Sequence, residues 1–108
     1  MTVDSSQNSA QKLPAVLVTD AAQRSALAVI RSLGRAGVPV IACDTIASAI
    51  GGASRYCQRY VVCPDSRNNP LEFINWVASF CSDENISAVF PVTETSSQAL
   101  LMHRQRLN

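Results

Sequence analysis

Apolar residues fall into two kinds of segment along the chain, short continuous runs and longer stretches with helical spacing. The continuous runs lie at residues 15–19, 38–43, 60–63 and 86–91. Runs that do not alternate with polar residues are typical of strands buried on both faces, as in a parallel sheet. Helical spacing covers residues 21–36, 70–82 and a last stretch through His103. The pattern therefore predicts alternating strands and helices.

This alternation predicts an α/β fold, a Rossmann-like open parallel sheet of about four strands with helices on both faces. Right-handed crossovers and short connections favour the strand order 3-2-1-4. In that order the first and fourth strands are neighbours, and the chain leaves them in opposite directions. Ligands of open α/β sheets bind in the crevice at such a point, so the loops after these two strands are the candidate site.

The length of 108 residues corresponds to one domain. Residues 1–13 are polar and rich in Ser, Gln and Asn, which predicts a disordered tail followed by a single domain over residues 14–108. Small residues at 45–54 predict a loop, with one helical turn at residues 54–57.

Short motifs predict where the helices begin and end. Asp20 with Gln23 is a capping box for the first helix, and Thr95 with Gln98 is one for the last. Asn69 is predicted to cap the second helix, with Pro70 as its first residue. The first helix is predicted to end at Gly37 in the left-handed conformation.

The two crevice loops have similar chemistry, because each offers a hydroxyl, a carboxylate and the free N–H groups of a helix start. Such a pair suits a ligand with a cationic or hydroxyl part and an anionic part. The candidate substrate-binding residues are Asp20, Thr93, Glu94 and Arg55. Helix capping alone is the commoner explanation for an aspartate at position 20, and an ordinary surface position is the commoner one for Arg55.

Other site chemistries find little support in the sequence. Asp44 follows the second strand, where a dinucleotide fold has its ribose-binding acid, but the turn after the first strand has no glycine and there is no phosphate loop. Metal-ligand spacing is missing among the four cysteines, Cys43, Cys57, Cys63 and Cys81. We therefore expect reduced structural thiols, no metal site and no catalytic residue.

Composition and net charge give no support for several classes of binding partner. A formal net charge of +1 gives no reason to expect binding to nucleic acid or to an anionic membrane. Apolar runs are too short for a membrane span, and residues 1–9 lack the basic and apolar regions of a signal peptide. A soluble, cytoplasmic protein is expected.

Four stretches together resemble the N-terminal domain that precedes the ATP-grasp fold in biotin carboxylase, carbamoyl phosphate synthetase and related carboxylate–amine ligases. They lie at residues 16–20 with 24–27, and at 51–57, 61–65 and 90–94. The likeness is nearest to carbamoyl phosphate synthetase-like ATP-grasp proteins. It departs from the larger synthetases at Asp20-Ala21-Ala22, where those enzymes carry a glycine-rich turn.

The resemblance implies that ATP and Mg²⁺ bind in later domains and that this domain supplies one wall of the site for a small-molecule acceptor substrate. The chain ends at Asn108, where those ATP-grasp domains would begin, so a truncated chain that does not catalyse ligation alone is expected. Apolar surface left uncovered near the fourth strand would favour a homo-oligomer.

Two alternatives from other functional classes remain. The first is a free-standing Rossmann-like module that binds a nucleotide or a metabolite. The second is a flavodoxin-like regulatory domain such as a receiver, which needs a lysine after a late strand. Lys12, in the predicted tail, is the only lysine in the sequence, which disfavours the receiver.

Overall fold

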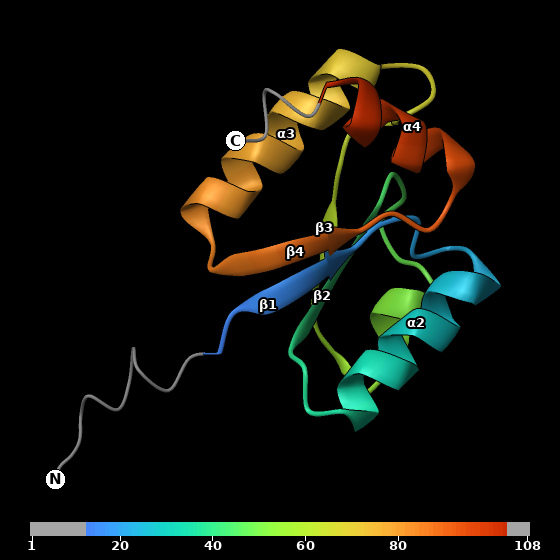
Figure 1. The fold of residues 1–108 in the computed structure, drawn as a ribbon. Helices are drawn as coiled ribbons and strands as arrows, with labels where there is room; N and C mark the ends of the chain where they lie inside the picture. Colours follow the sequence, from blue (N-terminus) through green and yellow to red (C-terminus); the bar gives the residue numbers. More distant parts are fainter. Residues whose placement is uncertain (1–12, 104–108) are drawn as a thin grey trace, which may run out of the picture.

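The computed structural model describes residues 13–103. Its strands, shown in Figure 1, are β1 (Ala15–Val18), β2 (Val40–Asp44), β3 (Cys57–Val62) and β4 (Ile86–Phe90). They form one sheet in the order β3-β2-β1-β4, and every neighbouring pair is parallel. The predicted fold class and strand order are confirmed.

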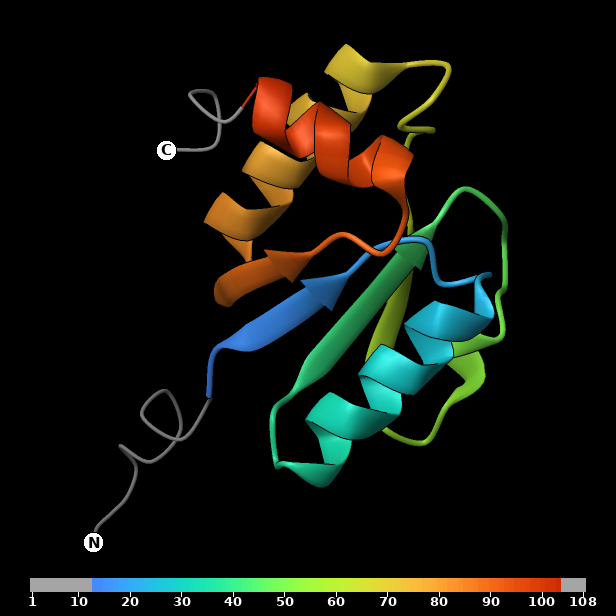
Figure 2. The same cartoon turned by 45° about the vertical axis from the view of Figure 1, so that its right-hand side comes forward.

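Helices cover both faces of this sheet (Figures 1 and 2). One face carries α2 (Arg24–Arg35) and the short 3₁₀ turn η1 (Gly51–Ala53), and the other carries α3 (Pro70–Asp83) and α4 (Glu94–Met102). Side chains alternate along a strand, so β1 sends Val18 into the core under α2 and Leu17 into the core under α3. Both faces of the strand are buried, which explains its continuous apolar run.

The segment between β1 and α2 differs from the prediction, because α2 begins at Arg24 and not at residue 21. Ala21 is fully buried and ties this segment to two others. Its N–H donates to the carbonyl of Cys43 (3.0 Å), and its carbonyl accepts from the N–H of Gly51 (2.8 Å). A Cβ on Gly51 would lie 2.8 Å from that carbonyl oxygen, so the approach requires glycine. The turn predicted at residues 54–57 directly follows η1, with the N–H of Cys57 donating to the carbonyl of Ser54 (3.0 Å).

The helix caps were partly mispredicted. Gln23 precedes α2 without a side-chain cap, and Asp20 has a positive φ of 59° in the turn before it. At α4 the cap is Thr93, whose Oγ1 accepts from the N–H of Ser96 (3.2 Å), and not Thr95. Asn69 precedes α3 but makes no side-chain cap bond. The left-handed Gly37 after α2 is confirmed, with φ of 85°.

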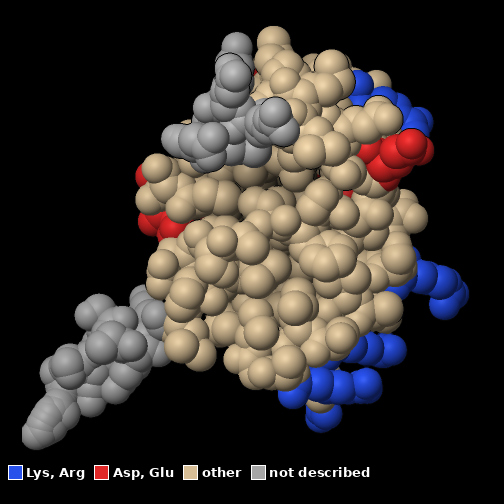
Figure 3. All heavy atoms as spheres, viewed as in Figure 1, with Lys and Arg blue, Asp and Glu red and all other residues tan. Residues whose placement is uncertain are grey.

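Several sequence expectations concern the chain as a whole. The predicted tail lies outside the described residues except for Leu13. Within the described range, no helix is long and apolar enough to cross a membrane, and the four cysteines are free thiols. Basic side chains gather over α2, which carries Arg24, Arg31 and Arg35 (Figure 3).

Candidate functional site

Asp20 connects the loops that follow β1 and β4. Its carboxylate accepts hydrogen bonds from the N–H of Thr93 (3.2 Å) and the hydroxyl of Ser96 (3.0 Å), and also from the neighbouring Thr19 hydroxyl. The Thr19 Oγ1 in turn accepts from the N–H of Val92 (3.2 Å). Thr19 and Ser96 are each only 1% exposed, so the network lies under the surface of the crevice.

This network explains the backbone of Asp20 and limits what its carboxylate can bind. A left-handed conformation is costly for most residues, but aspartate tolerates it better than others. The carboxylate beside the N-terminus of α4 is also favoured by the helix dipole. Three of its roughly four acceptor positions are already used, so Asp20 organises the site and has about one position left for a ligand.

Asp44 performs a similar structural task at the end of β2. Its Oδ2 accepts from the N–H of Ala22 (2.8 Å) and its Oδ1 from the N–H of Thr45 (2.7 Å). Both oxygens are therefore engaged by backbone groups. The carboxylate thus ties the loop after β1 to the end of β2.

The crevice has a main volume of about 290 Å³ and a deeper recess of about 80 Å³. The two share Asp20, Asp65 and Ser66 as lining residues. Asp65 accepts from the N–H of Arg67 (2.8 Å) and from the side-chain amide of Asn68 (2.8 Å), which shapes the loop that leads into α3. The Ser66 hydroxyl oxygen lies 3.2 Å from that of Ser96, within hydrogen-bonding distance. The loop after β3 therefore takes part in the hydrogen-bond network that connects the loops after β1 and β4.

Unused hydrogen-bonding groups remain around the main volume. Within residues 13–103, the side chains of Gln23, Arg67 and Thr95 line it and have no hydrogen-bond partner. Gln23 is the residue before α2, and its side chain does not cap that helix. The crevice therefore offers a guanidinium, hydroxyl and amide groups and a partly used carboxylate.

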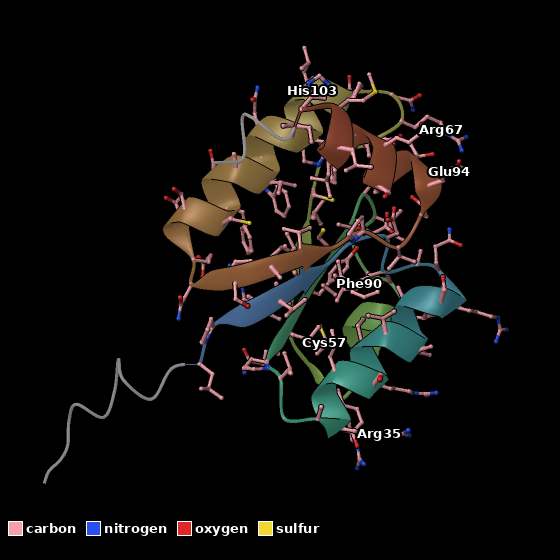
Figure 4. All side chains as sticks on the ribbon, viewed as in Figure 1. Arg35, Cys57, Arg67, Phe90, Glu94 and His103 are labelled. Carbon is pink, nitrogen blue, oxygen red and sulfur yellow. The ribbon has the colours of Figure 1, made fainter. Side chains whose placement is uncertain are left out.

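The structure brings together only some of the predicted site residues. Asp20 and Thr93 line the crevice, while Glu94 is exposed on the first turn of α4, outside the lining (Figure 4). Arg67 lies on the same side of the molecule as Glu94. Glu94 thus stands near the mouth of the crevice, not within it.

The prediction that Arg55 lines this crevice is wrong. Arg55 precedes β3, whose first residue Cys57 pairs with Val40, the first residue of β2, so it lies at the amino ends of the strands. There its guanidinium donates to the Tyr56 hydroxyl (3.1 Å) and lies 5.0 Å from the centre of that ring. The error arises because β3 begins three residues earlier than predicted, at Cys57. The chain has therefore already passed from the carboxyl ends to the amino ends of the strands when it reaches Arg55.

Tyr56, beside Arg55, and Cys43, near the crevice, are among the groups whose pKa values are shifted by their surroundings. The Arg55 guanidinium, and to a smaller extent that of Arg35, lowers the pKa of Tyr56. Under the crevice, a hydrogen bond with Cys63, burial and the nearby aspartates raise the pKa of Cys43 far above its ordinary value. Cys43 is therefore a protonated thiol at neutral pH, not a nucleophile.

Sequence reasoning missed the contribution of the loop after β3, namely Asp65, Ser66 and Arg67. A signal was available, because this loop follows a strand and precedes a helix, as the two predicted loops do. The carboxyl ends of parallel strands meet at one edge, so all three loops contribute.

A larger hollow of about 500 Å³ lies at the amino ends of the strands. Its charged side chains, Arg59 and Glu84, pair with each other at 3.2 Å and so satisfy their own charges. Within the described residues no group of three or more His, Cys, Asp or Glu is arranged to hold a metal ion. The polar crevice is therefore the better candidate site.

Comparison of the sequence with known proteins identifies no family for this chain. The sequence matches no family model, and it matches no curated protein. The functional argument therefore rests on the fold and on the residues of the crevice.

Proposed function

We propose that this domain forms one wall of the acceptor-substrate site of an ATP-dependent carboxylate–amine ligase of the ATP-grasp kind. The main support for this proposal is the crevice, an open polar site at the carboxyl ends of β1 and β4. Asp20 connects the loops that form it, through hydrogen bonds to Thr93 and Ser96. Its shallow shape suits a substrate that further ligase domains would enclose. The resemblance in sequence order supports the same assignment.

The chemistry of the lining supports a substrate with two different polar ends. The remaining acceptor position of Asp20 and the Thr93 hydroxyl suit an amine or a hydroxyl group. Arg67 suits a carboxylate or phosphate, and the Gln23 side-chain amide can donate to the same group. Glu94 stands at the mouth, where it would contact the cationic part as the substrate enters. In this proposal the domain binds and orients the acceptor and performs no covalent step.

ATP and Mg²⁺ belong to the later domains in this proposal. The turn Asp20-Ala21-Ala22 has no glycine that would let a pyrophosphate approach the backbone. This feature disfavours the alternative, a free-standing nucleotide-binding module, although a small metabolite remains compatible with the crevice.

Calorimetric titration of this chain tests the proposal. A panel of small amino acids and hydroxy acids is expected to include a weak ligand, and ATP–Mg²⁺ is expected to bind poorly. Arg67→Gln should reduce binding of that ligand about tenfold through loss of a charged hydrogen bond, while Arg31→Gln on the exposed side of α2 should leave it unchanged. Tight binding of ATP–Mg²⁺, with a low micromolar Kd, would contradict the proposal and support the nucleotide-binding module.

A further inference from the structure

Three exposed arginines lie where α2 ends and β3 begins, at the amino ends of the strands. Arg31 and Arg35 are four positions apart on α2, so their side chains share one face of that helix. Arg55 comes shortly before β3, and its guanidinium donates to the Tyr56 hydroxyl (3.1 Å). Figure 4 shows Arg35 at the opposite end of the molecule from Glu94, so this cluster is separate from the crevice.

Tyr56 connects the arginines of the two elements. Its ring packs into the core under α2 and lies so close to Gly34 that no side chain would fit at residue 34. Its hydroxyl interacts with the Arg55 guanidinium and also with that of Arg35, and both arginines lower the pKa of the phenol. Because packing holds the ring in place, two guanidinium groups from different elements meet at one hydroxyl.

No carboxylate neutralises this cluster within residues 13–103. The one ion pair of that range joins Arg59 to Glu84 (3.2 Å), and in Figure 3 no acidic side chain lies beside the basic ones over α2. Arg31 and Arg35 repel each other, as like charges four positions apart on a helix do. The Tyr56 hydroxyl supplies a hydrogen-bond acceptor but, as a neutral phenol, no charge. Guanidinium N–H donors and positive charge therefore remain available to an anion.

We propose that Arg35 and Arg55, with Arg31 beside them, bind the phosphate group of a small phosphorylated molecule. A guanidinium presents paired N–H donors that match two phosphate oxygens, and a phosphate monoester carries nearly two negative charges at neutral pH. One such group offsets the charge of two arginines, which a carboxylate would not. The net charge of +1 gives no comparable attraction for a long polyanion. The inference does not depend on the proposed ligase function, since the site lies at the other edge of the sheet.

An NMR titration with inorganic phosphate at neutral pH and constant ionic strength tests this site. Phosphate should shift the signals of Tyr56 and of residues 34–37 in a saturable way, with a millimolar Kd, and acetate should bind at least about fivefold more weakly. Arg35→Gln and Arg55→Gln should each weaken phosphate binding at least about fivefold. Arg24→Gln is the matched control, because Arg24 is exposed at the start of the same helix and should leave binding unchanged. Circular dichroism and melting curves establish that the variants fold.

The ionisation of Tyr56 gives a second measurement. Bound phosphate disfavours the phenolate and offsets the arginines, so it should raise the pKa of Tyr56 back toward its ordinary value. The pKa of Tyr60, whose hydroxyl instead donates to the carbonyl of Ile46, should not change. Shifts that do not saturate, or equal weakening by Arg24→Gln, would overturn the proposal. A short single-stranded oligonucleotide that binds more tightly than inorganic phosphate at the same ionic strength would also overturn it, because the cluster would then be a nucleic-acid contact.

Discussion

Asp20 shows at the scale of single residues what local sequence rules can and cannot reveal. Asp20 follows a buried strand, and for this reason it was predicted to belong to the candidate binding site. Thr93 was predicted on the same ground. The rules assigned it to the helix that follows, but its carboxylate bonds the N–H of Thr93 and the hydroxyl of Ser96. These partners lie more than seventy positions away, and a capping motif that spans four residues contains no information about them.

The first prediction concerns Asp20 itself. Asp20→Ala should lower the free energy of unfolding by about 2–4 kcal/mol, because the buried donors lose their acceptor and alanine is strained in the left-handed conformation. Asp20→Asn should cost less, since asparagine tolerates that conformation and keeps one acceptor oxygen. Urea denaturation measures both. Equal losses for the two variants would mean that hydrogen bonding and backbone strain are not the causes.

Glu94 should behave in the opposite way. It is exposed, and Thr93 already caps α4, so Glu94→Gln should change Tm by no more than about 3 °C, through the helix dipole alone. In the full-length ligase that we propose for this domain, the same change should reduce turnover. Glu72→Gln, in the first turn of α3, is the control and should affect neither. Lost stability with normal turnover per folded molecule would make Glu94 a structural residue.

At the scale of elements, the strands and their order were predictable, whereas the connections between them were not. Continuous apolar runs identify strands with two buried faces, and the right-handed crossover rule then orders them. The late start of α2 depends instead on a contact between Ala21 and Gly51, which are thirty positions apart. Arg55 was misplaced for a related reason, because the early start of β3 depends on its pairing with β2.

Gly51→Ala tests that contact. The added methyl group would lie 2.8 Å from the Ala21 carbonyl oxygen and 2.9 Å from the Ile30 side chain, so about 1–3 kcal/mol of stability should be lost. Hydrogen exchange at the Ala21 amide should also accelerate, since the turn must move. Gly37→Ala is the comparison, because φ there is 85° but nothing lies within 4 Å. It should destabilise the fold without changing exchange at Ala21, and faster exchange there in both variants would contradict this account.

At the scale of the whole molecule, composition describes the total charge but not its distribution. The net charge of +1 correctly describes a nearly neutral chain. The total does not say where the charges lie, and the arginines of α2 gather on one part of the surface (Figure 3). The cysteines were predicted as structural thiols. Because these thiols are buried or partly buried, the free energy of unfolding should depend on pH, which the composition alone does not predict.

The last prediction concerns stability at alkaline pH. Burial raises the pKa of Cys57 and Cys81 above 9.0, and the contact with Cys63 together with burial raises that of Cys43 much further. A thiol with a raised pKa in the folded state stabilises the fold fully below its unfolded value, and this stabilisation is lost as pH rises above that value. Unfolding free energy should therefore fall above about pH 9, by up to about 1.4 kcal/mol per pH unit for each such thiol.

Urea denaturation between pH 8 and pH 10.5 measures this slope. Cys43→Ala should be less stable at neutral pH because of the cavity it leaves, yet its stability should depend less on pH than that of the wild type. Cys81→Ala is the matched control, because Cys81 is only partly buried and should flatten the slope less. The ionisation of Tyr56 acts in the opposite direction, since its pKa is lowered, so Arg55→Gln should make the fall in stability slightly steeper. An unchanged slope in Cys43→Ala would show that the thiol under the crevice does not cause the alkaline loss of stability.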